Sequence, residues 1–431
     1  MRINQEFPCL FNLLRSRCNY IFTFLFFCFP AVVFPQSYFL DSLLNSCLAH
    51  YDKVLRNPSS FRLQVFYTQI NRDSLNAPQF TDHQFRVANE YVYPASTVKL
   101  PMSILALIKL EELNLPRLEK SSAMITDSAF TCRKRIVADS TSGKGYPSLE
   151  NYLKKMLLVS DNQAFARTYD FVSYDYAHKK LFDLGFDKIK MPNRLEGQCY
   201  GDTVSGTAPV YFLSSGGDTI YKQKGSVLSL HLEHPFKPST AGTFHRNGKG
   251  RWVNGPKDFS THNYLPLADL HRLMKKLVFN NYRSAPEKIP LSEENRTFLL
   301  KQLGRYPRES DFPDYNPKQF YDSYKKYLMY GSAVARITQD TLRIMNIVGR
   351  AYGFLIDCAY VVDLKNNIEF LVTCAIYVNK NGKIGSGKYE YDEVGLPFMK
   401  DLGWCIYNYE RNRKRDFNPD LSEFYQLFNR E

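Results

Sequence analysis

The sequence predicts an α/β (α+β) fold, in which strands near both chain ends form one antiparallel sheet with flanking helices and an all-helical lobe is inserted between them. Alternating or continuous apolar runs typical of strands occur at 62–70 and again at 353–363 and 368–379. Helical periodicity fills the stretch between them, at 96–114, 148–158, 162–171 and 267–279. Strands from both ends can join in one sheet that carries the terminal helices on one face.

The first residues have the pattern of an export signal. Arg15 and Arg17 precede an apolar stretch of about fifteen residues, and the polar pair Gln36-Ser37 follows it. The stretch is short for a membrane span. We predict a signal peptide over 1–36 that is cut near Gln36, which places the mature protein in the periplasm or outside the cell. An uncleaved N-terminal anchor is the alternative.

The mature chain, 37–431, then reads as one domain. Its sheet part takes 37–95, with a helix at 38–55, a strand at 62–70 and room for a short strand at 85–88, together with 335–431, which closes with a helix at 396–412. The helical lobe takes 96–334. Within it, about 204–257 is rich in Gly, Ser, Thr, His and Lys, and we expect an insertion of loops there, with or without a hairpin.

Charge and composition limit the partners that the chain could have. The formal net charge is +13, but the cations are scattered, and neither a zinc-ligand spacing nor a compact basic helix is visible. A solvated surface is the favoured interpretation, and attraction to an anionic envelope surface comes next. We expect no metal, no cofactor, no nucleic-acid partner, a membrane contact only through the export signal, and a monomer.

Six cysteines remain after the leader, and their spacing is not that of a metal site: Cys47, Cys132, Cys199, Cys358, Cys374 and Cys405. An exported chain can oxidise them. Cys358 and Cys374 flank a turn near Asn366, and a three-residue loop would place them opposite each other, whereas a two-residue loop would not. Free buried thiols are the default.

Three short motifs could carry chemistry. Ser96 and Lys99 lie one helical turn apart and share a face, so that a buried neutral lysine could take the serine proton. Ser160-Asp161-Asn162 joins two helical patterns, and Asn193-Arg194-Leu195-Glu196 lies in a loop. Taken singly, each motif is also explained as a helix cap or a solvated charge.

In order and spacing the three motifs resemble the class A serine β-lactamases, within the penicilloyl-serine transferase group. The resemblance covers about Ser37 to Asn412, without the insertion. It implies that Ser96 is the acylated nucleophile and Lys99 its activating neighbour. Ser160 would relay a proton, Asn162 would hold the substrate amide, and Glu196 would position the deacylating water. Arg194 would stiffen the loop that carries Glu196.

The sequence departs from this family at two places. The expected Lys-Thr/Ser-Gly motif reads Ile347-Val348-Gly349, so that a cation and a hydroxyl are missing. Losing such a charged contact costs about 1.5–3 kcal/mol. The Gly349-Arg350 stretch could still bring a backbone amide to the oxyanion, and the Arg350 side chain could either replace the cation or point to solvent. The second departure is Tyr200, which stands where the family usually has asparagine.

Three functions follow, in order of preference. The first is an exported serine hydrolase that opens a β-lactam or another amide through an acyl-enzyme on Ser96. The second is a relative that acts on cell-wall peptides or esters in the manner of a D,D-peptidase, which the broken third motif favours and Glu196 disfavours. The third is a non-catalytic module that binds the cell wall.

Overall fold

A computed structural model of the chain describes residues 38–129, 133–195, 206–227, 232–284, 287–334, 336–339 and 341–428. The predicted export signal, Glu196, Tyr200, Cys132 and Cys199 lie outside the described residues. All the described residues belong to the unit Gln36–Glu431, which is compact by itself.

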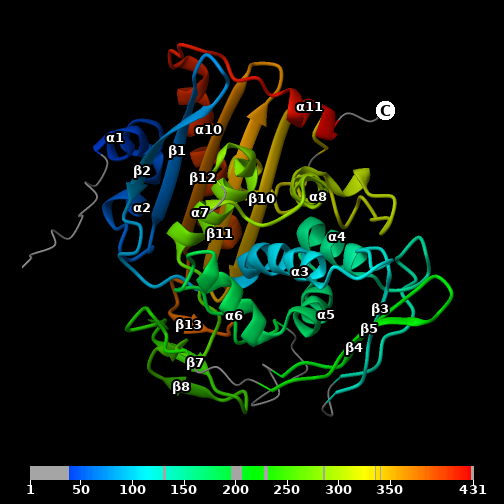
Figure 1. Ribbon diagram of the computed structural model, residues 1–431. Helices are drawn as coiled ribbons and strands as arrows, with labels where there is room; N and C mark the ends of the chain where they lie inside the picture. Colours follow the sequence, from blue (N-terminus) through cyan, green and yellow to red (C-terminus); the bar gives the residue numbers. More distant parts are fainter. Residues whose placement is uncertain are drawn as a thin grey trace, which may run out of the picture. The chain divides into compact units, whose positions relative to one another are not determined.

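Both chain ends contribute to a five-stranded antiparallel sheet with the order β10-β11-β12-β1-β2, as Figure 1 shows. β1 (Gln64–Arg72) and β2 (Pro78–Phe85) come from the N-terminal side. β10 (Leu342–Ala351), β11 (Phe354–Asp363) and β12 (Ile368–Tyr377) come from the C-terminal side. The two groups meet where β1 pairs with β12, and this confirms the predicted sheet.

Each face of the sheet is covered, which explains why β11 and β12 read as nearly continuous apolar runs. One face packs against α1 (Tyr38–Cys47), α9 (Tyr327–Tyr330) and α10 (Leu396–Asn412). The other packs against α7 (Leu267–Val278) and the lobe. Because side chains alternate along a strand, Ile356 and Cys358 face the lobe, whereas Leu355 and Ala359 face α10.

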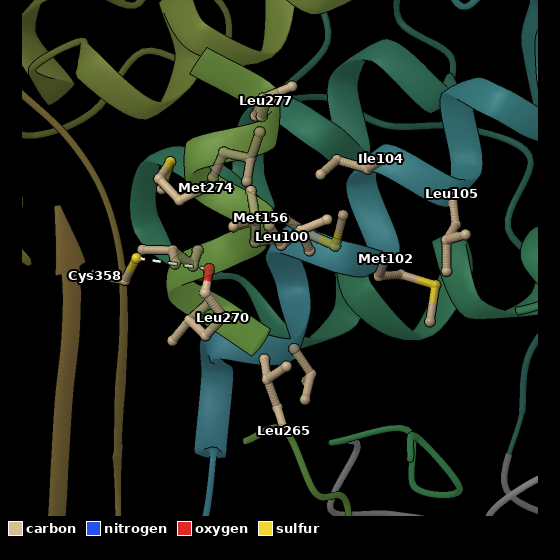
Figure 2. Close-up of a cluster of buried hydrophobic side chains, with 14 of the residues drawn as sticks. Leu100, Met102, Ile104, Leu105, Met156, Leu265, Leu270, Met274, Leu277 and Cys358 are labelled. Atoms are coloured by element: carbon tan, nitrogen blue, oxygen red, sulfur yellow. Dashed lines mark hydrogen bonds between the residues drawn. The ribbon is translucent and has the colours of Figure 1, made fainter. Parts of the chain in front are cut away.

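The core between sheet and lobe is filled by aliphatic and sulfur-containing side chains. Figure 2 shows Leu100 and Met102 of the lobe beside Leu270 and Met274 of α7, with Cys358 of β11 at the sheet. The Cys358 thiol lies 3.9 Å from the Leu270 carbonyl. This packing fixes the start of the lobe's first helix against the sheet.

Five helices build most of the lobe: α3 (Lys99–Leu113), α4 (Leu149–Val159), α5 (Asn162–Val172), α6 (Tyr174–Asp183) and α8 (Glu293–Gly304). The prediction of an all-helical lobe is wrong in one respect. β3 (Ala123–Thr126), β4 (Val210–Leu213) and β5 (Thr219–Gln223) form a separate three-stranded sheet. Its strands are four to five residues long, which is too short to show a clear period of two in the sequence.

The predicted insertion contains hairpins. β4 and β5 form one, and β7 (Phe244–Arg246) and β8 (Trp252–Asn254) form another. β6 (Thr240–Ala241) pairs with β9 (Lys257–Asp258). β13 (Lys383–Ile384), from the C-terminal part of the chain, adds to β7 in parallel.

Smaller differences concern the chain ends. The expected helix at 38–55 is interrupted at Leu48 and continues as a 3-10 turn, η1 (Ala49–Tyr51), and α2 (Asp52–Arg56). The second strand, β2, overlaps the predicted 85–88 only at Phe85 and otherwise precedes it, and the tail carries α11 (Ser422–Phe428). The remaining turns are η2 (Ala95–Val98), η4 (Asn280–Tyr282), η6 (Pro307–Glu309) and the π-turn η7 (Tyr391–Gly395). Among the described helices, none has the length and apolar character that crossing a bilayer requires.

The structure contains a disulfide, but it does not join Cys358 and Cys374, the pair that the sequence analysis considered. Cys47 of α1 and Cys405 of α10 form a disulfide, with their Cα atoms 5.9 Å apart. Cys358 and Cys374 are buried free thiols, as the default expectation has it. Cys374 lies opposite Asp357 in the β11–β12 ladder, one residue out of register with Cys358, so the two thiols face opposite sides of the sheet.

The Cys47–Cys405 disulfide joins helices that are 358 residues apart in sequence, so it restricts the unfolded chain strongly. We expect the double variant Cys47→Ser/Cys405→Ser to lose about 2–4 kcal/mol of unfolding free energy in guanidinium titrations. A reductant should lower the stability of the unmodified chain and leave that of the double variant unchanged. Equal stability of the two oxidised proteins would contradict the prediction.

Candidate active site

Ser96 lies in η2, the 3-10 turn that leads into α3 at the border between sheet and lobe. The preceding residue, Ala95, has a φ of 48°, in the left-handed region that residues with a Cβ seldom adopt. The turn is held by Thr97, whose backbone N–H and hydroxyl both donate to the Pro94 carbonyl, at 3.1 and 2.8 Å. Ser96 itself is half-buried. A strained, over-determined turn is a frequent feature of functional sites.

The Lys99 amine is fully buried, and it contacts three residues of the predicted motifs, Ser96, Ser160 and Asn162. Its Nζ lies 3.1 Å from Ser96 Oγ, 2.9 Å from Ser160 Oγ and 2.7 Å from Asn162 Oδ1. It also donates to the Ser160 carbonyl at 2.5 Å. The carbonyl and amide oxygens can only accept hydrogen bonds, so they hold two amine hydrogens and leave the remaining position toward the two hydroxyls.

Burial controls the protonation of this amine. Desolvation lowers the pKa of Lys99 from 10.5 to about 7, and the nearby Asp161 carboxylate opposes the shift. Near neutral pH a large fraction of Lys99 is therefore the neutral amine. A neutral amine within hydrogen-bond distance of a serine hydroxyl can act as a general base.

The corner between α4 and α5 presents Ser160 and Asn162 to Lys99. Ser160 ends α4 with a φ of 61°, and this left-handed conformation turns both its hydroxyl and its carbonyl toward the amine. Asp161 is the N-cap of α5 and accepts from the Ala164 N–H at 2.8 Å, so the plain capping interpretation is correct for this residue. The Asn162 carbonyl oxygen is taken by Lys99, which leaves the amide nitrogen to donate elsewhere.

Arg194 anchors the segment that leads to Glu196. Its guanidinium is buried and binds both carboxylate oxygens of Asp170 in α5, at 2.5 and 3.0 Å. Asp170 also accepts from the Ala208 N–H at 2.7 Å, and Arg194 reaches the Gly206 carbonyl at 3.2 Å. One buried carboxylate thus holds the chain on both sides of 196–205. Glu196 itself lies outside the described residues, so its predicted role stays a prediction.

Asp170 was missed by the sequence analysis. The available signal was a single acidic residue on the apolar face of the amphipathic helix α5, where a charge is expected only if it is paired. Arg133 was missed as well: its guanidinium lies 3.5 Å from the Asp170 carboxylate and donates to the Gly206 carbonyl at 2.6 Å. Nothing in the sequence linked these residues.

β10 closes the other side of Ser96. Gly349 packs directly on the turn, since a Cβ built there would lie 2.4 Å from the Pro94 carbonyl oxygen and 3.3 Å from the Ala95 Cβ. Ile347 shares this face of β10 and is buried in the core, so no cation or hydroxyl from these two positions reaches the site.

The Arg350 side chain does not replace the missing cation. Along β10 it alternates with Gly349, and its guanidinium lies 5.0 Å from the ring centroid of Tyr391, on the face that Val348 shares. The hypothesis that Arg350 compensates for the missing lysine is therefore not supported. The side chain is exposed, which agrees with the alternative that it points to solvent. Its backbone amide, which follows Gly349, remains the part of Arg350 that can serve the site.

A second buried lysine supports the Ser160 corner and was also missed. Lys325 Nζ donates to the Leu157 carbonyl in the last turn of α4 at 2.8 Å. Burial, together with the neighbouring amines of Lys326 and Lys99, holds the pKa of Lys325 well below its ordinary value. Lys325 thus satisfies a carbonyl that the end of the helix leaves without an intrahelical partner. In the sequence, two consecutive lysines look like charges on a solvated surface, and this is why Lys325 was missed.

Replacement of Gly349 by alanine tests the contact between β10 and the nucleophile turn. Because the added Cβ would clash with backbone at 2.4 Å, either β10 or Pro94–Ala95 must move. We expect Gly349→Ala to lose about 1–3 kcal/mol of unfolding free energy and to slow acylation of Ser96 roughly tenfold to a hundredfold. Gly216→Ala is the matched control, since its Cβ would meet only side-chain atoms at 3.6 Å or more. Similar kinetics in both variants would contradict the prediction.

In the part of the chain that the structure describes, no group of three or more His, Cys, Asp or Glu side chains could hold a metal ion. The described centre consists of two hydroxyls, one amine and one amide. This set is suited to nucleophilic acyl transfer.

Several solved structures that are similar to the chain are β-lactamases. A β-lactamase from Sphaerobacter thermophilus matches with 12% identity, covers 85% of this chain and 97% of its own, and has a TM-score of 0.44. A β-lactamase from Xanthomonas campestris has 13% identity, coverages of 85% and 98%, and a TM-score of 0.46. A class A β-lactamase from Clostridium kluyveri has 12% identity, coverages of 84% and 99%, and a TM-score of 0.44.

No protein-family model and no curated protein sequence matches the chain. Identities of 12–13% and TM-scores below 0.5 say nothing about the chemistry of this chain. The contacts of Lys99 are the evidence for that chemistry.

Proposed function

We propose that this chain is an exported serine hydrolase of the class A β-lactamase type, which opens an amide through an acyl-enzyme on Ser96. The observation that carries the proposal is the buried Lys99 amine, with a pKa near 7, in contact with both the Ser96 and the Ser160 hydroxyls. The substrate would be a β-lactam or a cell-wall peptide. The place of action would be the periplasm or the cell exterior.

In the acylation step, neutral Lys99 takes the proton of Ser96 as Oγ attacks the substrate carbonyl. The backbone amides of Ser96 and Arg350 would bind the resulting oxyanion. The Lys99 ammonium returns a proton through Ser160 Oγ, 2.9 Å away, to the departing nitrogen as the C–N bond breaks. Asn162, whose oxygen is held by Lys99, would donate its amide N–H to the substrate amide. Water positioned by Glu196 would then cleave the ester.

A hydrolase that acts on cell-wall peptides or esters, in the manner of a D,D-peptidase, is the second candidate, and one observation favours it. The face of β10 beside Ser96 carries buried Ile347 and Gly349, without the cation and hydroxyl that would bind a β-lactam carboxylate. A hydrolase whose natural substrate is a cell-wall peptide or an ester would not need these two groups to bind a β-lactam carboxylate. Such a protein could still be acylated by β-lactams, and with Tyr200 in place of the family's asparagine it would release them slowly.

One experiment tests both candidates. The chain from Gln36 onward is incubated with a chromogenic cephalosporin while colour and intact mass are followed together. Multiple turnovers support the β-lactamase proposal, and a stable adduct without turnover supports the second candidate. Ser96→Ala should abolish both signals, whereas Ser215→Ala, in an exposed turn, should change neither. Absence of colour and adduct in the unmodified chain would contradict a hydrolase and leave the non-catalytic module.

A further inference from the structure

Positive charge gathers in two short segments outside the candidate active site. Residues 234–257 and 380–388 contain eight Lys and Arg residues and no Asp or Glu, in a chain whose net charge is +13. The segments are more than a hundred residues apart, yet β13 pairs with β7 and joins them in one sheet, β13-β7-β8. Figure 1 shows the three strands together. Their cations are therefore concentrated locally and are not scattered as the sequence analysis assumed.

The outer face of this sheet carries aromatic side chains among the cations. Strand register places Arg246 opposite Trp252, and Phe244 beside Lys383, all on one face. Trp252 is 44% exposed and Phe244 is 39% exposed. The Arg246 guanidinium lies 5.0 Å and the Lys383 amine 5.8 Å from the Trp252 ring centroid. We use the name basic aromatic face for this face together with the cations of the adjacent turns, namely Lys249 and Arg251 between β7 and β8 and Lys388 after β13.

The charges of the basic aromatic face are available to a partner. None of its five Lys and Arg side chains forms an ion pair with a carboxylate among the described residues, namely Arg246, Lys249, Arg251, Lys383 and Lys388. Lys237, in contrast, is paired with Glu233 at 3.0 Å and is not part of the face. All five cations are exposed.

We propose that the basic aromatic face binds an anionic membrane surface. Exposed Trp and Phe prefer the level of lipid headgroups, and each nearby Lys or Arg adds attraction to anionic lipids. Single-stranded nucleic acid fits this face less well than a membrane does, because its bases stack on aromatic rings that are open along a groove. Here two cations lie against the Trp252 ring, so the ring is not open for stacking. The face would hold the enzyme at a membrane independently of its chemistry.

Vesicle binding tests the proposal with the chain from Gln36 onward, which lacks the apolar leader. Neutral phosphatidylcholine vesicles are compared with vesicles that also contain phosphatidylglycerol, at low and at physiological salt. We expect binding to the anionic vesicles only, weakened by salt. The variant Arg246→Glu/Lys249→Glu/Arg251→Glu should lower the partition coefficient at least about a hundredfold. The matched control, Lys179→Glu/Lys301→Glu/Lys414→Glu, makes the same charge change at exposed positions elsewhere and should retain most of the binding.

A second readout does not depend on the charge variants. The chain has two tryptophans, so Trp404→Phe leaves Trp252 as the only indole. Its fluorescence should shift to the blue on anionic vesicles and be quenched by brominated lipid. An unshifted spectrum, equal loss of binding in both triple variants, or equal binding to neutral vesicles would overturn the proposal. Binding of polyuridylate without binding of vesicles would overturn it in favour of a nucleic-acid partner.

Discussion

Replacement of Lys99 by methionine is expected to slow acylation of Ser96 about a thousandfold, because a positioned general base contributes roughly 10²–10⁴ in rate. In the unmodified chain the acylation rate should rise with pH through about 7, as Lys99 loses its proton. Lys99→Met should lack this rise. Lys99→Arg keeps a cation that cannot deprotonate, so it should be as slow as the methionine variant. Fast acylation by the arginine variant would show that charge, not basicity, is what Lys99 supplies.

Lys109→Met is the matched control for this experiment. Lys109 lies on the same helix, and burial also lowers its pKa, to about 8, but its amine bonds to the carbonyls of Phe171 and Val172, away from Ser96. We expect Lys109→Met to change the stability of the protein and to leave the pH dependence of acylation unchanged. If Lys99→Met and Lys109→Met both abolished the rise of the acylation rate with pH, the cause would be disturbed packing and not the loss of a general base.

Lys99 also makes stability depend on pH in a defined direction. Its pKa is about 7 in the folded chain and near 10.5 when unfolded, so the unfolded chain binds more protons between these values. The contribution of Lys99 to the free energy of unfolding therefore rises with pH from about 7 to about 10.5. Denaturant titrations at several pH values should show this rise in the unmodified chain and a smaller one in Lys99→Met.

Asp170→Ala is expected to lose about 3–5 kcal/mol of unfolding free energy, because it leaves buried positive charge without its partner. Arg194, whose side chain is 1% exposed, would lose both of its carboxylate contacts. The backbone N–H of Ala208 would lose its acceptor as well. Urea or guanidinium unfolding measures the loss directly. Asp187→Ala, at an exposed position, should change stability by less than about 0.5 kcal/mol.

The kinetic consequence of Asp170→Ala should separate the two half-reactions. Ser96, Lys99 and Ser160 do not contact Asp170, whereas the segment that leads to Glu196 depends on it through Arg194. At a temperature where the variant is folded, we expect deacylation to slow more than acylation, so that the mass adduct accumulates. Equal slowing of both steps would contradict the role assigned to Arg194.

The sequence predicted the parts of the site that local pattern determines. The helical patterns at 148–158 and 162–171 placed Ser160 and Asn162 at a helix corner, and the structure has α4 and α5 there. Lys99 comes three positions after Ser96, which puts the two residues about one helical turn apart, and their side chains are in contact. These features depend on helical periodicity and spacing, which a single sequence carries.

What the sequence did not predict depends on contacts between distant segments. Asp170 with Arg194, and Lys325 with the end of α4, join elements through buried polar side chains that look solvated when read in isolation. The Cys47–Cys405 pair has no local spacing to reveal it. Ile347 and Val348 were recognised as unusual, but only the alternation of β10 shows that the Arg350 side chain lies on the far face from Ser96.

The pairing of β1 with β12 has a consequence for how the protein is made. Gln64 and Ala375 are neighbours in the ladder, so β1 has no permanent partner on that edge until the ribosome has added more than three hundred further residues. The N-terminal strand therefore stays unpaired on that edge until the segment at 368–377 has been synthesised. A nonsense mutation anywhere before β12 would therefore leave β1 without its neighbour on that edge and produce a fragment that is open to proteolysis.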